Sequence, residues 1–210
     1  MKKYWWILVI PILIIGAWLI FNPKKPGYTE LNAGPHLQGN PDASISLVEF
    51  SDFQCPACQA AFTMAHDLIA NYGDKIKLEY RHFPLPQHSY ALGAAVAAEC
   101  AADQGKFWEY YDLLFPNQAK LTKADLSGYA AQVEGLNADL WQVCAASGVK
   151  EKRVKADLAE AIKQGFNSTP TFLLNGQKVE DWSALPGIIQ SLLQPAVSLN
   201  PAASATSTVK

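Results

Sequence analysis

Two kinds of hydrophobic spacing divide the middle of the chain into strands and helices. Residues 44–50 (SISLVEF) are a short, apolar and β-branched run, which predicts a buried strand. Residues 60–72 repeat apolar side chains at helical spacing, and Gly73 then acts as a helix stop. Residues 75–83 (KIKLEYRHF) alternate apolar and polar positions, which predicts a second strand. Because a helix connects these two strands, we expect them to be parallel.

Helical patterns then fill residues 90–166. This region contains an alanine-rich stretch, an aromatic stretch, and three further segments that start near Thr122, Asn137 and Lys150. Thr122 and Asp125 resemble a capping box in which aspartate takes the place of the usual glutamate. The sequence therefore predicts a block of several helices between the second strand and whatever follows.

The strand pattern returns in residues 169–179 (TPTFLLNGQKV). Asn175-Gly176 lies between two short apolar segments, which is a strong signal for a β-hairpin. A final helix is predicted over about 183–193. The order β-α-β, helical block, β-β-α predicts an α/β fold in which an all-helical insertion, about 90–166, splits the sheet.

The N-terminus carries a long uncharged stretch, Tyr4–Phe21 (YWWILVIPILIIGAWLIF), directly after Lys2 and Lys3. At roughly 1.5 Å per residue it spans about 27 Å as a helix, close to the thickness of a bilayer core. A cleaved signal peptide and a retained signal anchor both have this character, but no small-x-small cleavage site follows it. We therefore expect residues 1–21 to be a transmembrane anchor, with the rest of the chain on the extracytoplasmic side of the cell membrane.

The regions that flank the folded part differ from it in composition. Residues 22–41 are rich in proline and glycine, which predicts an extended linker. Residues 195–210 are small and polar, which predicts a disordered tail. The folded domain is therefore expected to span residues 42–194.

The charge of the chain argues against one class of partner, nucleic acid. Seventeen basic and nineteen acidic side chains give a formal net charge of −2, and no basic stripe stands out. Nucleic acid is therefore not an expected partner.

The candidate chemistry lies in the four cysteines, Cys55, Cys58, Cys100 and Cys144. A structural zinc site usually needs two closely spaced ligand pairs, and only Cys55 and Cys58 are close, so no metal site is expected. A purely structural Cys55–Cys58 disulfide would close too short a loop to constrain much of the unfolded chain. A redox-active pair fits better, because the two cysteines lie where a strand ends and a helix begins.

A helix N-terminus favours a thiolate. Unpaired backbone N–H groups and the positive end of the helix dipole stabilise negative charge at Cys55. Pro56 suits the first helical turn, where a missing N–H costs nothing. Cys58 lies one turn further and is placed to attack a mixed disulfide formed at Cys55.

Four motifs occur in order along the chain: VEFSDFQCPAC, RHFPLPQH, AAECAADQGKFWEYYDLLF and GFNSTPTFLLNG. Together they resemble the DsbA-like branch of the thioredoxin superfamily, over roughly residues 39–193. The resemblance implies a thioredoxin-like fold interrupted by a helical domain, in agreement with the α/β order drawn from the pattern.

The resemblance also implies roles for single residues. Cys55 matches the exposed nucleophile of the family and Cys58 its buried resolving cysteine. Pro170 matches the cis-proline that faces the disulfide, and the backbone of Thr169 would then pair with an extended substrate. Glu49 matches a buried acidic residue that relays the proton of the resolving cysteine.

The residues between the cysteines depart from the best-known members. Pro56-Ala57 stands where the strongly oxidising archetype has proline-histidine. Both residues are expected to border the substrate site. Losing the imidazole removes one source of thiolate stabilisation and leaves the direction of electron flow open. In the R-x-F-P-L corner, Arg81 and His88 are expected to have structural roles.

Cys100 and Cys144 lie in two predicted helices of the insertion. They are either buried free thiols or a disulfide that joins the helices. In an oxidising compartment the disulfide is the better interpretation.

These observations predict an enzyme: a membrane-tethered thiol–disulfide oxidoreductase that forms disulfides in exported proteins. It needs no cofactor. A membrane quinone-linked partner of the DsbB or vitamin K epoxide reductase type, implied by the family alone, would reoxidise it. The alternatives are a reductase or isomerase that uses the same site, and a non-enzymatic thioredoxin-like binding module or chaperone.

Overall fold

The computed structural model describes Tyr28 and residues 34–194. The predicted anchor (1–21), most of the predicted linker and the predicted tail (195–210) lie outside the described residues. Within the described part, no helix has the length and apolar character needed to cross a membrane.

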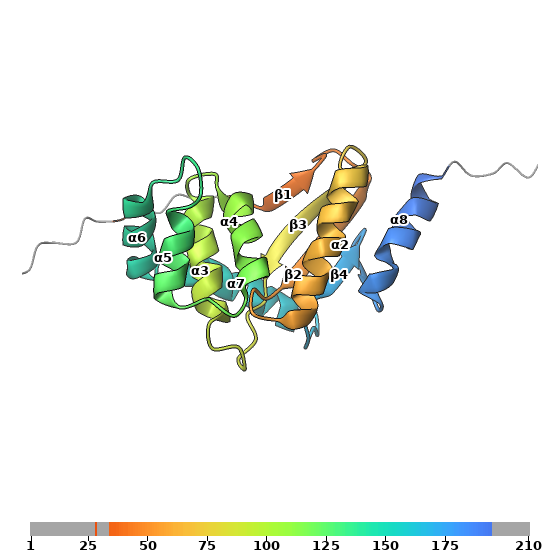
Figure 1. Ribbon diagram of the computed structural model, residues 1–210. Helices are drawn as coiled ribbons and strands as arrows, with labels where there is room; N and C mark the ends of the chain where they lie inside the picture. The colour runs from red at the N-terminus through yellow and green to blue at the C-terminus, as the bar shows by residue number, and fades with distance from the viewer. Residues whose placement is uncertain (1–27, 29–33, 195–210) are drawn as a thin grey trace, which may run out of the picture.

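A five-stranded sheet of order β1-β3-β2-β4-β5 forms the centre of the fold (Figure 1). Its strands are β1 (His36–Gly39), β2 (Ile45–Ser51), β3 (Ile76–His82), β4 (Thr171–Leu174) and β5 (Gln177–Val179). β2 and β3 are parallel, as the connecting helix predicts, and the other three pairs are antiparallel. The chain therefore returns from the insertion directly beside β2.

Strand β1 corrects the expected start of the folded domain, because it lies inside the residues predicted to be linker. It pairs antiparallel with β3, with His36 opposite Tyr80 and Gly39 opposite Lys77. Its sequence, HLQG, has one large apolar residue, Leu37, and that side chain is exposed. The strand forms because β3 offers an unpaired edge, which is information that local sequence does not contain.

Helices α2 (Pro56–Tyr72) and α8 (Leu185–Leu193, after a short 3-10 turn at Trp182–Ala184) pack on one face of the sheet. Their core there joins Ala65 and Leu68 of α2 to Leu185 and Ile189 of α8. α2 begins at Pro56, directly after Cys55, as the expected position of the cysteines at a helix N-terminus predicts, since proline is tolerated at the first helical position. It ends as predicted at Gly73, whose N–H donates to the Ile69 carbonyl.

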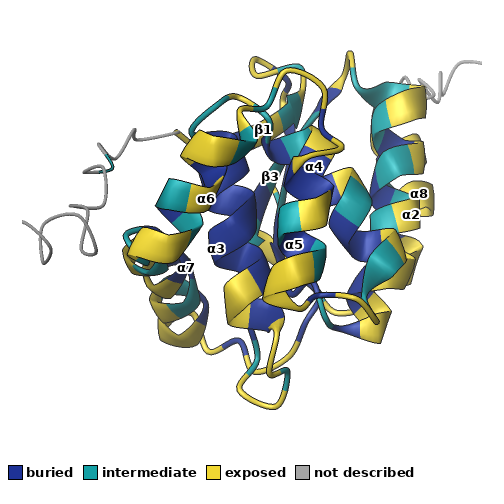
Figure 2. Cartoon of the chain, turned by 60° about the vertical axis from the view of Figure 1, so that its left-hand side comes forward, coloured by how far each residue is buried: buried dark blue, intermediate teal, exposed yellow. Residues whose placement is uncertain are grey.

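The insertion contains α3 (Ala91–Ala102), α4 (Phe107–Leu114), the 3-10 turn Phe115–Asn117, α5 (Lys123–Ala130), α6 (Ala138–Ser147) and α7 (Glu151–Lys163). The three predicted start points hold: α5, α6 and α7 directly follow Thr122, Asn137 and Lys150. The Thr122–Asp125 capping box is formed in both directions. Figure 2 shows α3 as the most buried helix, surrounded by its neighbours in the insertion.

Helix α7 leads back to the sheet and covers the face opposite α2 and α8. Ala161 of α7 packs in one cluster with Phe50 of β2 and Leu173 of β4. The observed architecture is therefore a thioredoxin-like α/β sheet with helices on both faces and a helical insertion, as the sequence predicts.

A disulfide joins two helices of the insertion. Cys100 of α3 and Cys144 of α6 are bonded; they are 44 positions apart in sequence and both are fully buried. The bond ties the central helix of the insertion to one of its outer helices.

We predict that Cys100→Ala/Cys144→Ala lowers the free energy of unfolding by about 4 kcal/mol, because the unfolded chain loses a cross-link that closes a loop of this size. Reversible denaturant unfolding measures the loss. The Cys55→Ser/Cys58→Ser protein, which keeps the cross-link, serves as the control. Non-reducing peptide mapping that found Cys100 and Cys144 as free thiols, with Cys55–Cys58 oxidised, would contradict this account.

Candidate active site

The candidate site lies in the turn between β2 and α2, and Asp52 organises that turn. One carboxylate oxygen accepts a hydrogen bond from the Gln54 N–H at 2.7 Å. The other accepts from the Leu85 N–H at 2.8 Å and lies 2.7 Å from Nδ1 of His88. The Asp52 carbonyl accepts from the Cys55 N–H at 3.1 Å. Asp52 therefore fixes the position of Cys55 and holds the corner after β3 against it.

Cys55 is the N-cap residue of α2. Its side chain is almost fully buried, which differs from the exposed position that the resemblance implies. Its Sγ lies 3.5 Å from the carbonyl oxygen of Thr169. A hydrogen bond from the Cys58 thiol, assisted by the backbone N–H groups of Ala57 and Cys58, outweighs burial and lowers the pKa of Cys55 to about 5. The Cys55 sulfur is therefore a thiolate at neutral pH when the pair is reduced.

Cys58 lies one helical turn further and is completely buried. Burial raises the pKa of Cys58 well above its ordinary value, and the neighbouring Cys55 raises it further. Cys55 and Cys58 are not bonded to each other in this structure, so the pair is in its reduced form. The pair is thus asymmetric: one sulfur is a ready nucleophile and leaving group, and the other holds its proton.

The other wall of the site comes from the end of the insertion. The Thr169–Pro170 peptide bond is cis, and β4 begins directly after it. β4 pairs with β2, with Thr171 opposite Phe50, so this turn is held beside the residues that lead into Cys55. The structure thereby brings Pro170 and Thr169 to the cysteines, as the resemblance implies. Pro56 and Ala57 lie exposed at the same place, on the first turn of α2.

Glu49 lies in the middle of β2, between Tyr80 of β3 and Phe172 of β4. It is completely buried, and neither carboxylate oxygen has a hydrogen-bond partner among the described residues. Burial raises the pKa of Glu49 to about 7. Burial raises the pKa of Tyr80 well above its ordinary value, and Glu49 and Cys58 are both close enough for a negative charge on either to raise it further.

Two residues of the corner after β3 have structural contacts. Arg81 forms ion pairs with Glu79, at 2.8 Å, and with Glu160 of α7. His88 binds Asp52, as described above. The sequence motifs did not single out Asp52. An aspartate side chain often accepts from the backbone N–H two residues further on, and this turn signal is present in SDFQC.

Taken together, the geometry can carry out thiol–disulfide exchange. A buried thiol with a raised pKa stands beside a thiolate with a lowered pKa, under a backbone carbonyl from a cis-proline turn. These are the features of a redox site in a thioredoxin-like domain.

Comparison with known proteins agrees with this class. A family model described as "Thioredoxin" matches residues 31–191. The chain therefore belongs to this thioredoxin family, as its resemblance to the thioredoxin superfamily implies.

Three solved structures illustrate the fold. A thioredoxin-like oxidoreductase from Silicibacter pomeroyi is 27% identical, with a TM-score of 0.66 over 77% of this chain and 94% of that one. BdbD from Bacillus subtilis is 20% identical, with a TM-score of 0.68 over 79% and 94% of the two chains. DsbA2 from Pseudomonas aeruginosa is 24% identical, with a TM-score of 0.63 over 80% and 100%.

The curated relatives are longer proteins. The Na(+)/H(+) antiporter NhaA of Herminiimonas arsenicoxydans is 39% identical in an alignment of 176 positions that covers 78% of this chain and 28% of the antiporter. NhaA 1 of Salinispora arenicola is 38% identical over 144 residues, 68% of this chain and 22% of that protein. The chain spans about a quarter of the length of the curated relatives it matches.

We predict that the Cys55 thiol of the reduced protein titrates near pH 5, as followed by the ultraviolet absorbance of the thiolate. Cys58→Ser keeps a hydrogen-bond donor and should leave the pKa of Cys55 low, whereas Cys58→Ala removes the donor and should raise it. A wild-type midpoint at the ordinary thiol value, about 8.5, would contradict the geometry.

The raised pKa of Glu49 predicts that the stability of the protein depends on pH. The folded chain keeps this carboxyl protonated up to about pH 7, whereas the unfolded chain ionises it near pH 4.5, so the folded state binds more protons across this window. Stability therefore falls as pH rises through it, by about 3 kcal/mol in total. The free energy of unfolding of Glu49→Gln, relative to that of wild type, should therefore rise by about 3 kcal/mol between pH 4 and pH 8 in denaturant unfolding. A constant difference between the two proteins at all pH values would contradict this pKa.

Proposed function

We propose that the protein is a thiol–disulfide oxidoreductase that forms disulfides in exported proteins. The asymmetry of the Cys55–Cys58 pair carries this proposal. A Cys55 thiolate that is stable once released favours the reduced form of the pair, so the oxidised pair is a good acceptor of electrons from substrates. The similar protein from Silicibacter pomeroyi is described as a thioredoxin-like oxidoreductase, which supports the class of activity.

The reaction consists of two exchange steps. In the first, a substrate thiolate attacks Cys55 Sγ of the Cys55–Cys58 disulfide; a mixed disulfide forms at Cys55, and Cys58 leaves and takes up a proton. In the second, another substrate thiolate attacks the substrate sulfur of the mixed disulfide and releases Cys55 as a thiolate. The substrate loses two electrons and gains a disulfide, and the enzyme pair is reduced.

Glu49 is proposed as the group that handles the proton of Cys58. Its pKa of about 7 lets it be protonated or ionised near neutral pH, as a relay requires. It is buried beside Tyr80, and its burial outweighs the opposing effect of the Ser51 side chain on its pKa.

Substrates are proposed to bind as extended segments along the turn before β4. The peptide unit of Thr169 lies against Cys55, so a strand-like substrate paired with this backbone would have its cysteine next to the nucleophile. Pro56 and Ala57 are exposed on the facing turn of α2 and would line the other side. Pairing through the backbone demands little of the substrate's sequence.

The setting is proposed from the sequence of residues 1–21, which has the length and character of a membrane anchor. A catalytic domain held on the extracytoplasmic side would meet exported proteins that contain cysteines. Each turnover leaves two electrons on Cys55 and Cys58, so a membrane quinone-linked protein is proposed to remove them.

The direct test compares the two directions of electron flow with the same purified protein. We expect the oxidised enzyme to convert a reduced two-cysteine peptide to its disulfide much faster than the reduced enzyme reduces insulin. Cys55→Ser should abolish both reactions, because no mixed disulfide can form.

Faster reduction than oxidation would replace the proposal by a reductase or isomerase, which is the outcome that Ala57 in place of histidine would favour. If the Cys55→Ser/Cys58→Ser protein complemented a strain lacking the gene as well as wild type does, the binding-module alternative would replace both.

A further inference from the structure

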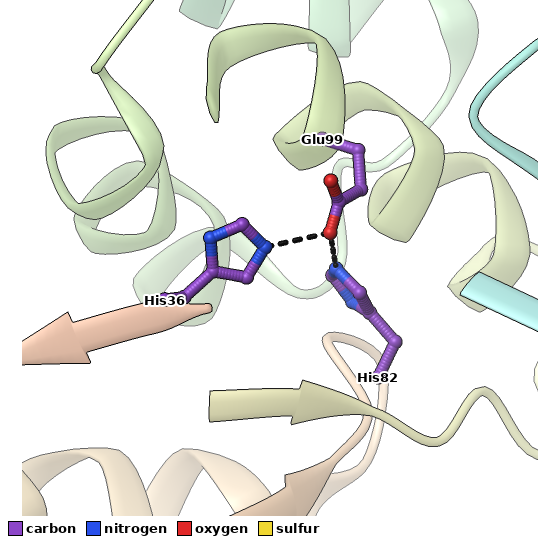
Figure 3. Close-up of side chains that lie close together, drawn as sticks. All are labelled: His36, His82 and Glu99. Atoms are coloured by element: carbon purple, nitrogen blue, oxygen red, sulfur yellow. Dashed lines mark hydrogen bonds and ion pairs between the residues drawn. The ribbon is translucent and has the colours of Figure 1, made fainter. Parts of the chain in front are cut away.

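A second cluster of titratable side chains lies outside the cysteine site, where β1, β3 and α3 meet (Figure 3). Oε1 of Glu99 lies 2.6 Å from Nε2 of His36 and 3.0 Å from Nε2 of His82. All three side chains are buried. The exchange reaction proposed above uses none of them.

We propose that His36, His82 and Glu99 bind one divalent transition-metal ion of the zinc class. Two imidazole nitrogens and one carboxylate oxygen are a ligand set that zinc prefers. The sequence predicts no metal site, because it has only one close pair of cysteines and His82 lies far from that pair along the chain. The fold brings His36 and Glu99 to His82 instead.

The distances fit an ion after a small adjustment. Ligand bonds of about 2.0–2.1 Å at a tetrahedral centre put neighbouring ligand atoms about 3.3 Å apart. The three ligand atoms all lie within 4.8 Å of one another, and Oε1 of Glu99 lies 2.6 Å and 3.0 Å from the two imidazole nitrogens. An ion between them therefore requires the Glu99–His36 separation to widen by about 0.7 Å, which side-chain rotation can supply. His36 is already oriented, because its ring stacks on Phe107 with centroids 3.7 Å apart and an interplanar angle of 2°.

The protonation states also suit a metal, which needs neutral imidazoles and an ionised carboxylate. Burial raises the pKa of Glu99, but the side-chain hydrogen bonds of His36 and His82 help to outweigh it and the pKa lies well below its usual range. Burial lowers the pKa of His36 despite the attraction of Glu99.

Arg153 of α7 is the competing cation. Its Nε lies 3.9 Å from Oε1 of Glu99 and 3.8 Å from Oδ1 of Asp157. The other carboxylate oxygen of Asp157 accepts a hydrogen bond from the backbone N–H of His82. The Arg153 side chain is 31% exposed, so it can turn toward solvent when an ion enters. The two carboxylates, Glu99 and Asp157, then balance the charge of a divalent cation.

Little room remains for a substrate, since the ligand side chains are between 1% and 4% exposed. The ion would therefore be structural. It would tie β1 to β3 and to the central helix of the insertion, which carries the Cys100–Cys144 disulfide one residue after Glu99.

The experiment measures zinc in the full chain, purified in detergent without a histidine tag, in a Cys55→Ser/Cys58→Ser background that removes thiolate ligands. Metal-stripped protein is titrated with Zn²⁺ alone, and bound metal is counted by mass spectrometry. We expect one Zn²⁺ per chain and a higher melting temperature when it is bound.

Substitutions at the site should change the affinity for zinc in opposite directions. Glu99→Gln and His36→Asn should weaken zinc binding by at least about 100-fold, since each removes a ligand. Arg153→Met should strengthen it, because the competing charge is gone. His66→Asn is the matched control: His66 also pairs with a carboxylate, Asp112 at 2.9 Å, but on the surface, and its loss should leave zinc binding unchanged.

The proposal is overturned if the parent protein binds no stoichiometric zinc, or if Glu99→Gln and His36→Asn bind it as the parent does while circular dichroism shows them folded. Should both variants unfold, Arg153→Met decides: tighter zinc binding supports the site, and unchanged binding refutes it.

Discussion

The antiparallel pairing of β2 with β4 sets the geometry on which the cysteine site depends. Cys55 and Thr169 are 114 residues apart in sequence, yet Cys55 Sγ lies 3.5 Å from the Thr169 carbonyl. The ladder that places Phe50 opposite Thr171 holds the end of β2 and the cis-proline turn side by side. Without it, the helix N-terminus at Cys55 would lack the Thr169 backbone as its neighbour.

The same arrangement explains how two cysteines three residues apart acquire different chemistry. Cys55 is the N-cap of α2, where the Cys58 thiol and the backbone N–H groups of Ala57 and Cys58 lower its pKa. Cys58 lies one turn further along α2, and its complete burial raises its pKa. One environment stabilises a negative sulfur and the other penalises it. The helical insertion contributes by completing the core that contains Cys58 and by returning the chain to the sheet through α7.

Sequence patterns predicted the elements whose signals are local. The parallel strands, the Asn175-Gly176 hairpin and the Thr122 capping box each depend on residues close together in the chain. β1 was missed because HLQG has little intrinsic strand character and depends on pairing with β3. For the site, Cys55, Cys58 and Pro170 carried motif signals that the resemblance interpreted, whereas Asp52 did not. The cluster of His36, His82 and Glu99 joins residues up to 63 positions apart, so only the folded chain shows it.

The reduction potential of the Cys55–Cys58 pair tests the central claim most directly, because the claim is that the fold stabilises the reduced pair through a Cys55 thiolate. Equilibration of the protein with glutathione buffers of known potential measures it. A Cys55 pKa of about 5 lies between the thiol pKa values of thioredoxin and DsbA, about 7 and 3.5. We expect the potential to lie between theirs as well, more oxidising than about −230 mV. A value at or below that of thioredoxin, about −270 mV, would contradict the account.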